Sequence, residues 1–171
     1  MSDKILSEVD ILVEVEAWSK VENLEATIQR AVDAALAAEG RSGASISLML
    51  GDDTAIRVLN ASFRGKDKPT NVLSFPAPVM PGDPEPALGD IALAYETCAR
   101  EAEEEGKTLA DHLTHLVIHG TLHLLGYDHE TEAEAEAMEA LETRILTGLG
   151  IADPYADSPA MGEPATRSAA R

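Results

Sequence analysis

One stretch, HGTLHLLGYDH, decides the fold of this chain, and it runs from His119 to His129. His119 and His123 are four residues apart, so on an α-helix their imidazoles lie on one face, one turn apart. Gly126 can end that helix with a positive φ, and the turn after it can bring His129 back toward the other two rings. Because three neutral imidazoles around one open position form a catalytic zinc site, the stretch predicts a metal centre.

The residues around the histidines favour a metal over an ordinary core position. The predicted helix is apolar on nearly every side, through Leu113, Leu116, Val117, Ile118, Leu122, Leu124 and Leu125. Such a helix is buried, and buried polar groups need partners. A lone helical histidine is usually a satisfied core or surface residue, but one ion would be a partner for all three rings.

Two further histidines, His112 and His115, precede the motif. His115 stands one turn before His119 on the same stripe, so helix geometry alone does not exclude it as a ligand. Ligands at 115, 119 and 123 would span about 12 Å along a straight helix at 1.5 Å per residue, too far for one ion. We therefore expect His119, His123 and His129 to bind the metal, and His112 and His115 to pack the helix or support the ligands from behind.

The composition is typical of one globular domain. The chain has 171 residues, 44% of them apolar and 26% charged. We expect a single domain over residues 1–157 and a disordered tail over 158–171, where Pro, Ala, Ser and Gly dominate. With no run of eighteen apolar residues, no leader segment and one cysteine, the sequence predicts a cytoplasmic protein. Cys98 is expected to fill a helix face.

The net charge of −18 argues against indiscriminate binding of nucleic acid. A local basic site remains compatible with it, because screening confines surface charges to roughly 8–10 Å. The acidic runs at 101–105 and 130–142 are expected to be solvated helix faces. The basic residues concentrate at Arg64, Lys66 and Lys68, which by themselves could equally be a solvated helix end.

The order of elements predicts an α+β fold. Strands are expected at 11–15, 44–50, 71–75 and 91–94, the last opened by Gly89 and Asp90. Helices are expected at 24–40, 53–65, 95–105, 108–126 and 131–149, with capping residues at Asp52 or Asp53, Thr108 and Thr131. Helices between the early strands favour parallel pairing, and short connections favour a mixed four-stranded sheet flanked by helices, with the histidine helix central and buried.

The spacing His-x3-His-x5-His also matches the metzincin protease signature except at Gly120. Those proteases carry Glu there as general base, and glycine has no proton acceptor. A reaction that relies on a metal and a cation, without a carboxylate base, therefore fits this chain better. A metallopeptidase-like hydrolase remains the alternative enzyme.

These motifs resemble a known family. The stretch from His119 to His129 resembles the signature of the YbeY family of bacterial metal-dependent endoribonucleases. Residues 59–76, LNASFRGKDKPTNVLSFP, resemble its second signature, and Gly89-Asp90-Ile91 matches a third, shorter element. The resemblance runs from about Asp52 to Tyr155.

The resemblance implies a zincin-like fold, one Zn²⁺ ion held by His119, His123 and His129, and Arg64 as the functional arginine. It implies a single-strand-specific endoribonuclease in rRNA maturation at the small-subunit 3′ end and in ribosome quality control. The expected partners are rRNA, the small ribosomal subunit and ribosome-associated proteins. We expect zinc-activated water to attack phosphorus, or zinc to orient the phosphate. Arg64 would stabilise the phosphate charge, and Lys66 and Lys68 would hold the flanking backbone.

Some alternatives stay open at this level. A non-catalytic ribosome-associated factor with structural zinc would need a fourth protein ligand, such as Cys98 or Asp128. Asp128 could orient an imidazole or shape the turn, and the turn is favoured. Tyr127 is expected to pack, while Thr70 and Asn71 could contact substrate or cap a strand. The acidic composition predicts weak, salt-sensitive binding to naked RNA and dependence on a protein partner at the ribosome.

Overall fold

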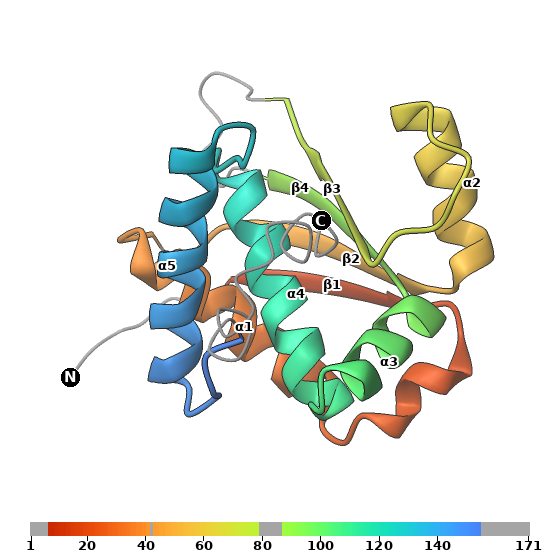
Figure 1. Ribbon diagram of the computed structural model, residues 1–171, viewed down its shortest axis with the longest axis horizontal. Coiled ribbons are helices and arrows are strands. Elements are labelled where there is room, and N and C mark those ends of the chain that lie inside the picture. The colour runs from red at the N-terminus through yellow and green to blue at the C-terminus, as the bar shows by residue number, and fades with distance from the viewer. Residues whose placement is uncertain (1–6, 42, 79–86, 155–171) are drawn as a thin grey trace.

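The computed structural model describes residues 7–41, 43–78 and 87–154. Within these residues one four-stranded sheet has the order β1-β2-β4-β3 (Figure 1). The elements are β1 (Glu8–Val13), the 3-10 helix η1 (Glu16–Lys20), α1 (Leu24–Ala38), β2 (Ser45–Gly51), α2 (Asp53–Arg64), β3 (Val72–Pro76), β4 (Ala87–Ala94), α3 (Tyr95–Glu104), α4 (Leu109–Leu124) and α5 (Glu132–Gly148). β1, β2 and β4 are parallel, and β3 is antiparallel to β4. The predicted mixed sheet is confirmed.

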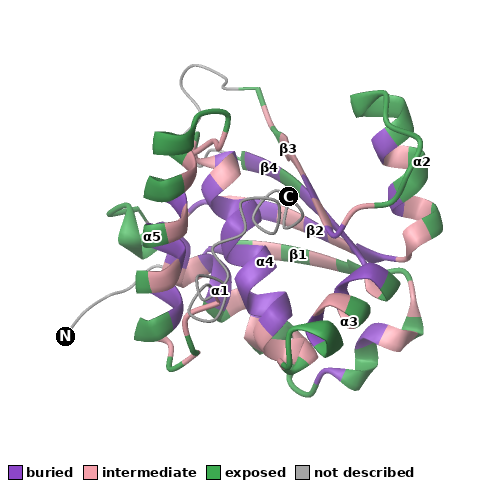
Figure 2. Cartoon of the chain, viewed as in Figure 1, coloured by how far each residue is buried: buried purple, intermediate pink, exposed green. Residues whose placement is uncertain are grey.

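The histidine helix α4 is the centre of the molecule. It is buried continuously from His112 to Leu122 (Figure 2), packs along α1 on one side and lies against β3 and β4 on the other. Ile91 and Leu93 of β4 belong to the core on this face of the sheet. The alternate residues Ala92 and Ala94 pack instead with α2 on the opposite face. The predicted central buried helix is therefore confirmed.

The predicted helix starts are confirmed by hydrogen bonds. Asp52 accepts from the amide of Ala55, and Thr108 accepts from the amide of Asp111. Thr131 and Glu134 bond reciprocally to each other's backbone amides, which is a complete capping box at the start of α5. These caps fix where α4 and α5 begin on either side of the histidine motif.

The starts of two strands differ from the expectation, and one short helix was not expected. β1 begins at Glu8, not Ile11, because its polar residues alternate along an edge strand with one exposed face. β4 begins at Ala87 and includes Gly89, whose φ of 143° lets the backbone pass close to Phe75 of β3. The helix η1 was not predicted.

The expected disordered tail over 158–171 lies outside the described residues, so the domain boundaries stay predictions. No helix within the described part of the chain is both long and apolar enough to cross a membrane.

At Gly120 the helix α4 lies in close contact with the sheet. A Cβ atom there would lie 2.9 Å from Cδ1 of Ile91 and 3.1 Å from Oγ of Ser74. The Ser74 hydroxyl also donates to the Gly120 carbonyl at 3.3 Å. The position where the zinc proteases carry their glutamate therefore faces the sheet and has no room for a side chain.

This contact predicts that Gly120→Glu destabilises the fold by about 3 kcal/mol or more, because it combines overpacking with a buried unpaired carboxylate. The matched control is Gly148→Glu at the exposed end of α5, where an added Cβ meets nothing within 4 Å. That variant should stay within about 1 kcal/mol of the parent protein. Urea denaturation measures both, and equal stability of the two variants would refute the contact.

Candidate metal centre

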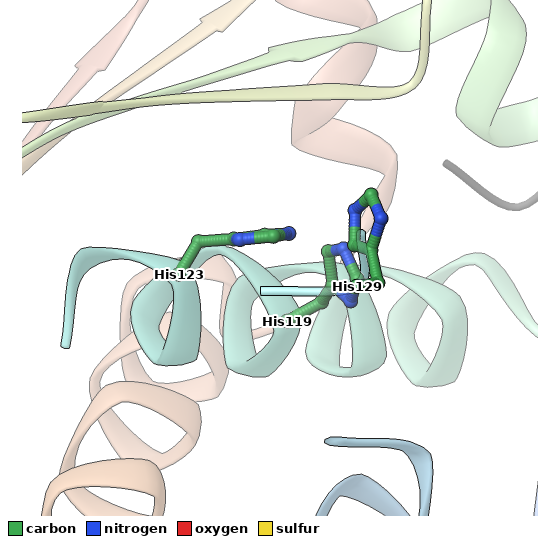
Figure 3. Close-up of side chains that lie close together, drawn as sticks. All are labelled: His119, His123 and His129. Atoms are coloured by element: carbon green, nitrogen blue, oxygen red, sulfur yellow. The ribbon is translucent and has the colours of Figure 1, made fainter. Parts of the chain in front are cut away.

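Three imidazoles meet at the end of α4. One ligand nitrogen from each of His119, His123 and His129 lies within 4.8 Å of the other two. His119 and His123 project from the same face of the helix, and His129 comes from the turn beyond it (Figure 3). The ring of His123 is nearly perpendicular to both others, with centroid distances of 4.6 Å to His119 and 4.8 Å to His129. The structure thus brings the three predicted residues together and leaves His115 outside the group.

Hydrogen bonds hold two of these rings by their Nδ1 atoms. Nδ1 of His119 lies 2.5 Å from a carboxylate oxygen of Glu142. Nδ1 of His123 lies 2.9 Å from the carbonyl oxygen of Tyr127. Since a carbonyl oxygen and an ionised carboxylate only accept, both rings donate through Nδ1–H and keep the Nε2 lone pair for a metal.

The turn between His123 and His129 is built by the backbone. The amide of Gly126, which has a φ of 107°, donates to the carbonyl of His123, and the amide of Tyr127 donates to Leu122. Asp128 accepts from the amide of His129 at 2.7 Å, which supports its role in the turn. The Tyr127 hydroxyl donates to Glu39 at the end of α1, which supports a packing role.

The donor set fits a metal ion. Three mutually close imidazoles can share one ion at roughly 2.0–2.1 Å with small side-chain adjustments. Desolvation, followed by the neighbouring His119 and His129, lowers the pKa of His123 to about 4. The ring is therefore neutral at pH 7 and available as a ligand. Within the described residues, no cysteine or carboxylate joins the group.

Glu142 is the supporting residue that the sequence interpretation missed. The run 130–142 was expected to be a solvated face, and for Glu142 this is wrong, because its side chain is 0% exposed. Burial opposes its charge, but hydrogen bonds with His115 and His119 outweigh that effect and lower the carboxyl pKa. Position 142 lies one turn after Met138 on the apolar stripe of α5, and a glutamate on that stripe was the available signal.

The two earlier histidines have carboxylate partners. Nε2 of His115 lies 2.8 Å from the second oxygen of Glu142, and Nε2 of His112 lies 2.8 Å from Glu101. Burial lowers the pKa of His115, so that ring is neutral. Glu101 also accepts from the side chain of Asn71 and is only 18% exposed, so its expected place on a solvated face is wrong as well.

The three imidazoles open into a cleft of about 880 Å³. Arg64, Lys66 and Lys68 line the same cleft, together with Arg100 of α3. These four cations outnumber the acidic residues of the lining, Glu101, Asp128 and Glu130. Arg64, Lys66 and Lys68, at the end of α2 and in the loop after it, form a basic wall of this cleft. The wall lies beside the candidate metal centre of a chain whose net charge is −18.

The loop that carries the basic residues is held by a side chain that the sequence interpretation did not select. Asn60 is 3% exposed. Its side-chain amide donates to the backbone carbonyl of Lys68, and its backbone carbonyl accepts from the amide of Lys66. Arg64 ends α2, donates to the carbonyl of Ser74 at 2.7 Å and lies 5.6 Å from the ring centre of Phe75. These contacts hold the arginine against β3, on the wall of the cleft.

Neighbouring residues take structural positions. Asn71 is 2% exposed, and its carbonyl accepts from the amide of Ala94, which supports the strand-capping role; it also lines the cleft, so substrate contact stays a prediction. Thr70 lines the cleft. Cys98 is fully buried, and burial raises the pKa of its thiol, consistent with the expected packing role.

The α+β fold and its central helix bring three imidazoles to a cleft that basic residues line. This arrangement is typical of metal-dependent hydrolases. The chain belongs to the endoribonuclease YbeY family, whose model matches residues 12–150. It is accordingly a hydrolase that acts on RNA.

Similar proteins cover most of this chain. The endoribonuclease YbeY of Chelativorans sp. (strain BNC1) is 57% identical over 152 residues, covering 86% of this chain and 93% of the relative. That of Allorhizobium ampelinum is 55% identical over 158 residues, covering 87% and 95%. The solution structure of TM1509 from Thermotoga maritima aligns with a TM-score of 0.51 at 27% identity, over 91% of this chain and 97% of that one.

The lowered pKa of His123 predicts a pH-dependent stability in the metal-free protein. The unfolded chain takes up a proton near pH 6.5, whereas the folded ring resists protonation until about pH 4. The free energy of unfolding should therefore fall as the pH drops from 6.5 toward 4. His123→Gln lacks this titration, so the stability of the parent relative to this variant should decrease between pH 7 and pH 5. Urea denaturation with chelator present measures it, and a pH-independent difference would contradict the assignment.

Proposed function

We propose that this protein is a zinc-dependent, single-strand-specific endoribonuclease that acts in rRNA maturation at the small-subunit 3′ end and in ribosome quality control. The observation that carries the proposal is that the three-imidazole group and Arg64 line one cleft. Its proposed metal ligands are His119, His123 and His129, for one Zn²⁺ ion. Its proposed catalytic side chain is Arg64.

The cleft suits a phosphodiester substrate. RNA cleavage passes through a transition state in which negative charge grows on the phosphate oxygens, so cations fixed beside the scissile bond accelerate it. Lys66 and Lys68 lie on the loop that directly follows Arg64 and line the same cleft. They can therefore bind the phosphates on either side of the scissile bond. The loop's attachment to Asn60 keeps these residues beside the cleft.

Arg64 is held in a way that suits transition-state binding. One Nη atom donates to Ser74 and the guanidinium lies near Phe75, so the side chain loses little freedom when it binds an anion. Its remaining N–H groups can donate to two phosphate oxygens at once. A metal bound by the imidazoles would supply a lowered pKa for water and polarisation of a phosphoryl oxygen. Arg64 would neutralise the negative charge that develops on the phosphate oxygens that the metal does not contact.

Two alternatives are less well supported. A metallopeptidase of the zinc-protease type needs the glutamate after its first histidine, and here that position is Gly120, packed against Ile91 and Ser74. A purely structural zinc site needs a fourth protein ligand. Within the described residues neither Cys98 nor Asp128 belongs to the ligand group, which leaves the fourth position to water or substrate.

The charge of the whole molecule bears on its partners. With 31 acidic and 13 basic residues, the protein should bind naked RNA weakly and with strong salt dependence. We infer that the small ribosomal subunit and its proteins supply part of the affinity for rRNA in the cytoplasm. The short basic wall would then select and align the strand at the cleavage site.

The test is RNA cleavage and metal content measured side by side on purified variants. Arg64→Ala should reduce cleavage of a single-stranded RNA about 100-fold or more while zinc content stays at one ion per chain. Arg64→Lys should recover only part of the activity, because lysine lacks the bidentate fork. His123→Ala should lose both zinc and activity. Lys66→Ala and Lys68→Ala should weaken RNA binding and its salt dependence.

The control is Arg30→Ala, an exposed arginine of α1 that does not line the cleft. It changes the net charge by the same amount and should leave cleavage unaltered. Unchanged cleavage by Arg64→Ala would remove this residue from the mechanism, and full activity in zinc-free His123→Ala would remove the metal.

A further inference from the structure

A single carboxylate connects two histidines in the core. Glu142 of α5 is 0% exposed, and its two oxygens accept from different rings of α4. One lies 2.8 Å from Nε2 of His115, and the other lies 2.5 Å from Nδ1 of His119. Of the two, His119 alone belongs to the candidate ligand group.

We propose that Glu142 is the positioning residue of the metal centre, which fixes the tautomer and orientation of His119 and thereby sets the affinity for the ion. The inference rests on the proposed metal site. Because a carboxylate offers only acceptors, His119 must carry its proton on Nδ1, which leaves the Nε2 lone pair directed away from Glu142. A neutral imidazole with the opposite tautomer would present N–H to the metal and could not bind it.

The burial of Glu142 supports a functional role over a purely stabilising one. Its helix neighbours on the buried stripe are Met138, Leu141 and Ile145, and an apolar residue would complete that stripe. Taking a carboxylate out of water is so unfavourable that a buried ionic contact rarely stabilises a fold more than a packed apolar side chain does. The bonds to His115 and His119 offset the desolvation, and their geometry constrains the orientation of both rings.

The second bond explains why Glu142 itself stays in place. His115 lies one turn before His119 on α4 and holds the other carboxylate oxygen, so the carboxyl group cannot rotate without breaking a contact. A planar group bonded at both oxygens has one orientation, and it transmits that orientation to the His119 ring. His115, which is too far along the helix to be a ligand, thus acts through Glu142.

The contact between Glu142 and His119 also links the position of His129 to that of His119. α5 is capped at Thr131, two residues after His129, and Glu142 joins that helix to α4 three turns further on. The turn that carries His129 is therefore held at both ends, by the end of α4 and by a docked α5. Glu142 forms a buried charged contact between these two helices.

The test compares Glu142→Gln with Glu101→Gln. The glutamine is nearly isosteric, but its amide accepts at one atom and donates at the other, so it no longer requires both rings to donate. Glu101→Gln is the matched control, since Glu101 makes the same 2.8 Å contact with Nε2 of His112, a ring outside the ligand group. Zinc affinity is measured by competition with a chromophoric chelator, and folding by circular dichroism.

We expect Glu142→Gln to remain folded and to bind zinc about 10- to 100-fold more weakly than the parent, with Glu101→Gln within about twofold of it. A second measurement needs no variant: nitrogen-15 NMR of the histidine rings in the metal-free parent should show His119 protonated at Nδ1. In Glu142→Gln the His119 signals should shift toward the other tautomer.

Two results would overturn the inference: parent-like zinc affinity in folded Glu142→Gln, or a His119 ring protonated at Nε2 in the metal-free parent. Failure of the proposed metal site gives a different result, in which His123→Ala retains zinc. If His123→Ala loses zinc while Glu142→Gln keeps it, the metal site stands and only the positioning role fails.

Discussion

Burial of α4 is the constraint on which the rest of this structure depends. The helix passes through the core with the rings of His112, His115 and His119 inside it. Buried polar rings must be paired, because an unmet donor or acceptor loses its water without compensation. Glu101 from α3 and Glu142 from α5 each pair with ring nitrogens of α4, so the helices around α4 are placed by polar contacts as well as by apolar packing.

The same constraint creates the cleft. Gly120 lets α4 lie against β3 and β4, which turns His119 and His123 toward the space between the helix end and the loop after α2. The absence of a side chain at this position also removes the base that a zinc protease would use. One close contact thus lets α4 lie against the sheet and narrows the chemistry that the site can perform.

Much of the architecture follows from local sequence signals. Asp52 or Asp53, Thr108 and Thr131 predict helix starts because capping is decided within four residues, and the structure has caps at Asp52, Thr108 and Thr131. His119, His123 and His129 could be grouped because helix periodicity and the Gly126 turn determine their positions locally. The edge strand β1 was harder, because its exposed face carries acidic residues that break the apolar pattern.

The partners of these residues could not be predicted in the same way. Glu142 is 23 residues from His119 in sequence, and its burial depends on how α5 docks against α4. Within an acidic run it resembles its solvated neighbours, and only its place on the stripe of Met138 distinguishes it. Glu101 was equally hard to predict, because its contact with His112 is made only in the folded chain. The same holds for Asn60, whose side chain holds the loop after α2.

We propose that one ion is bound by three imidazoles from α4 and the turn after it, with a fourth position open to the cleft. The most direct test is a crystal structure of the zinc-loaded protein with anomalous diffraction at the zinc edge. We expect one peak roughly 2.0–2.1 Å from nitrogens of His119, His123 and His129, with a water molecule as fourth ligand on the side of Arg64. A zinc ion bound by His115, or one whose fourth position is filled by a protein side chain, would contradict it.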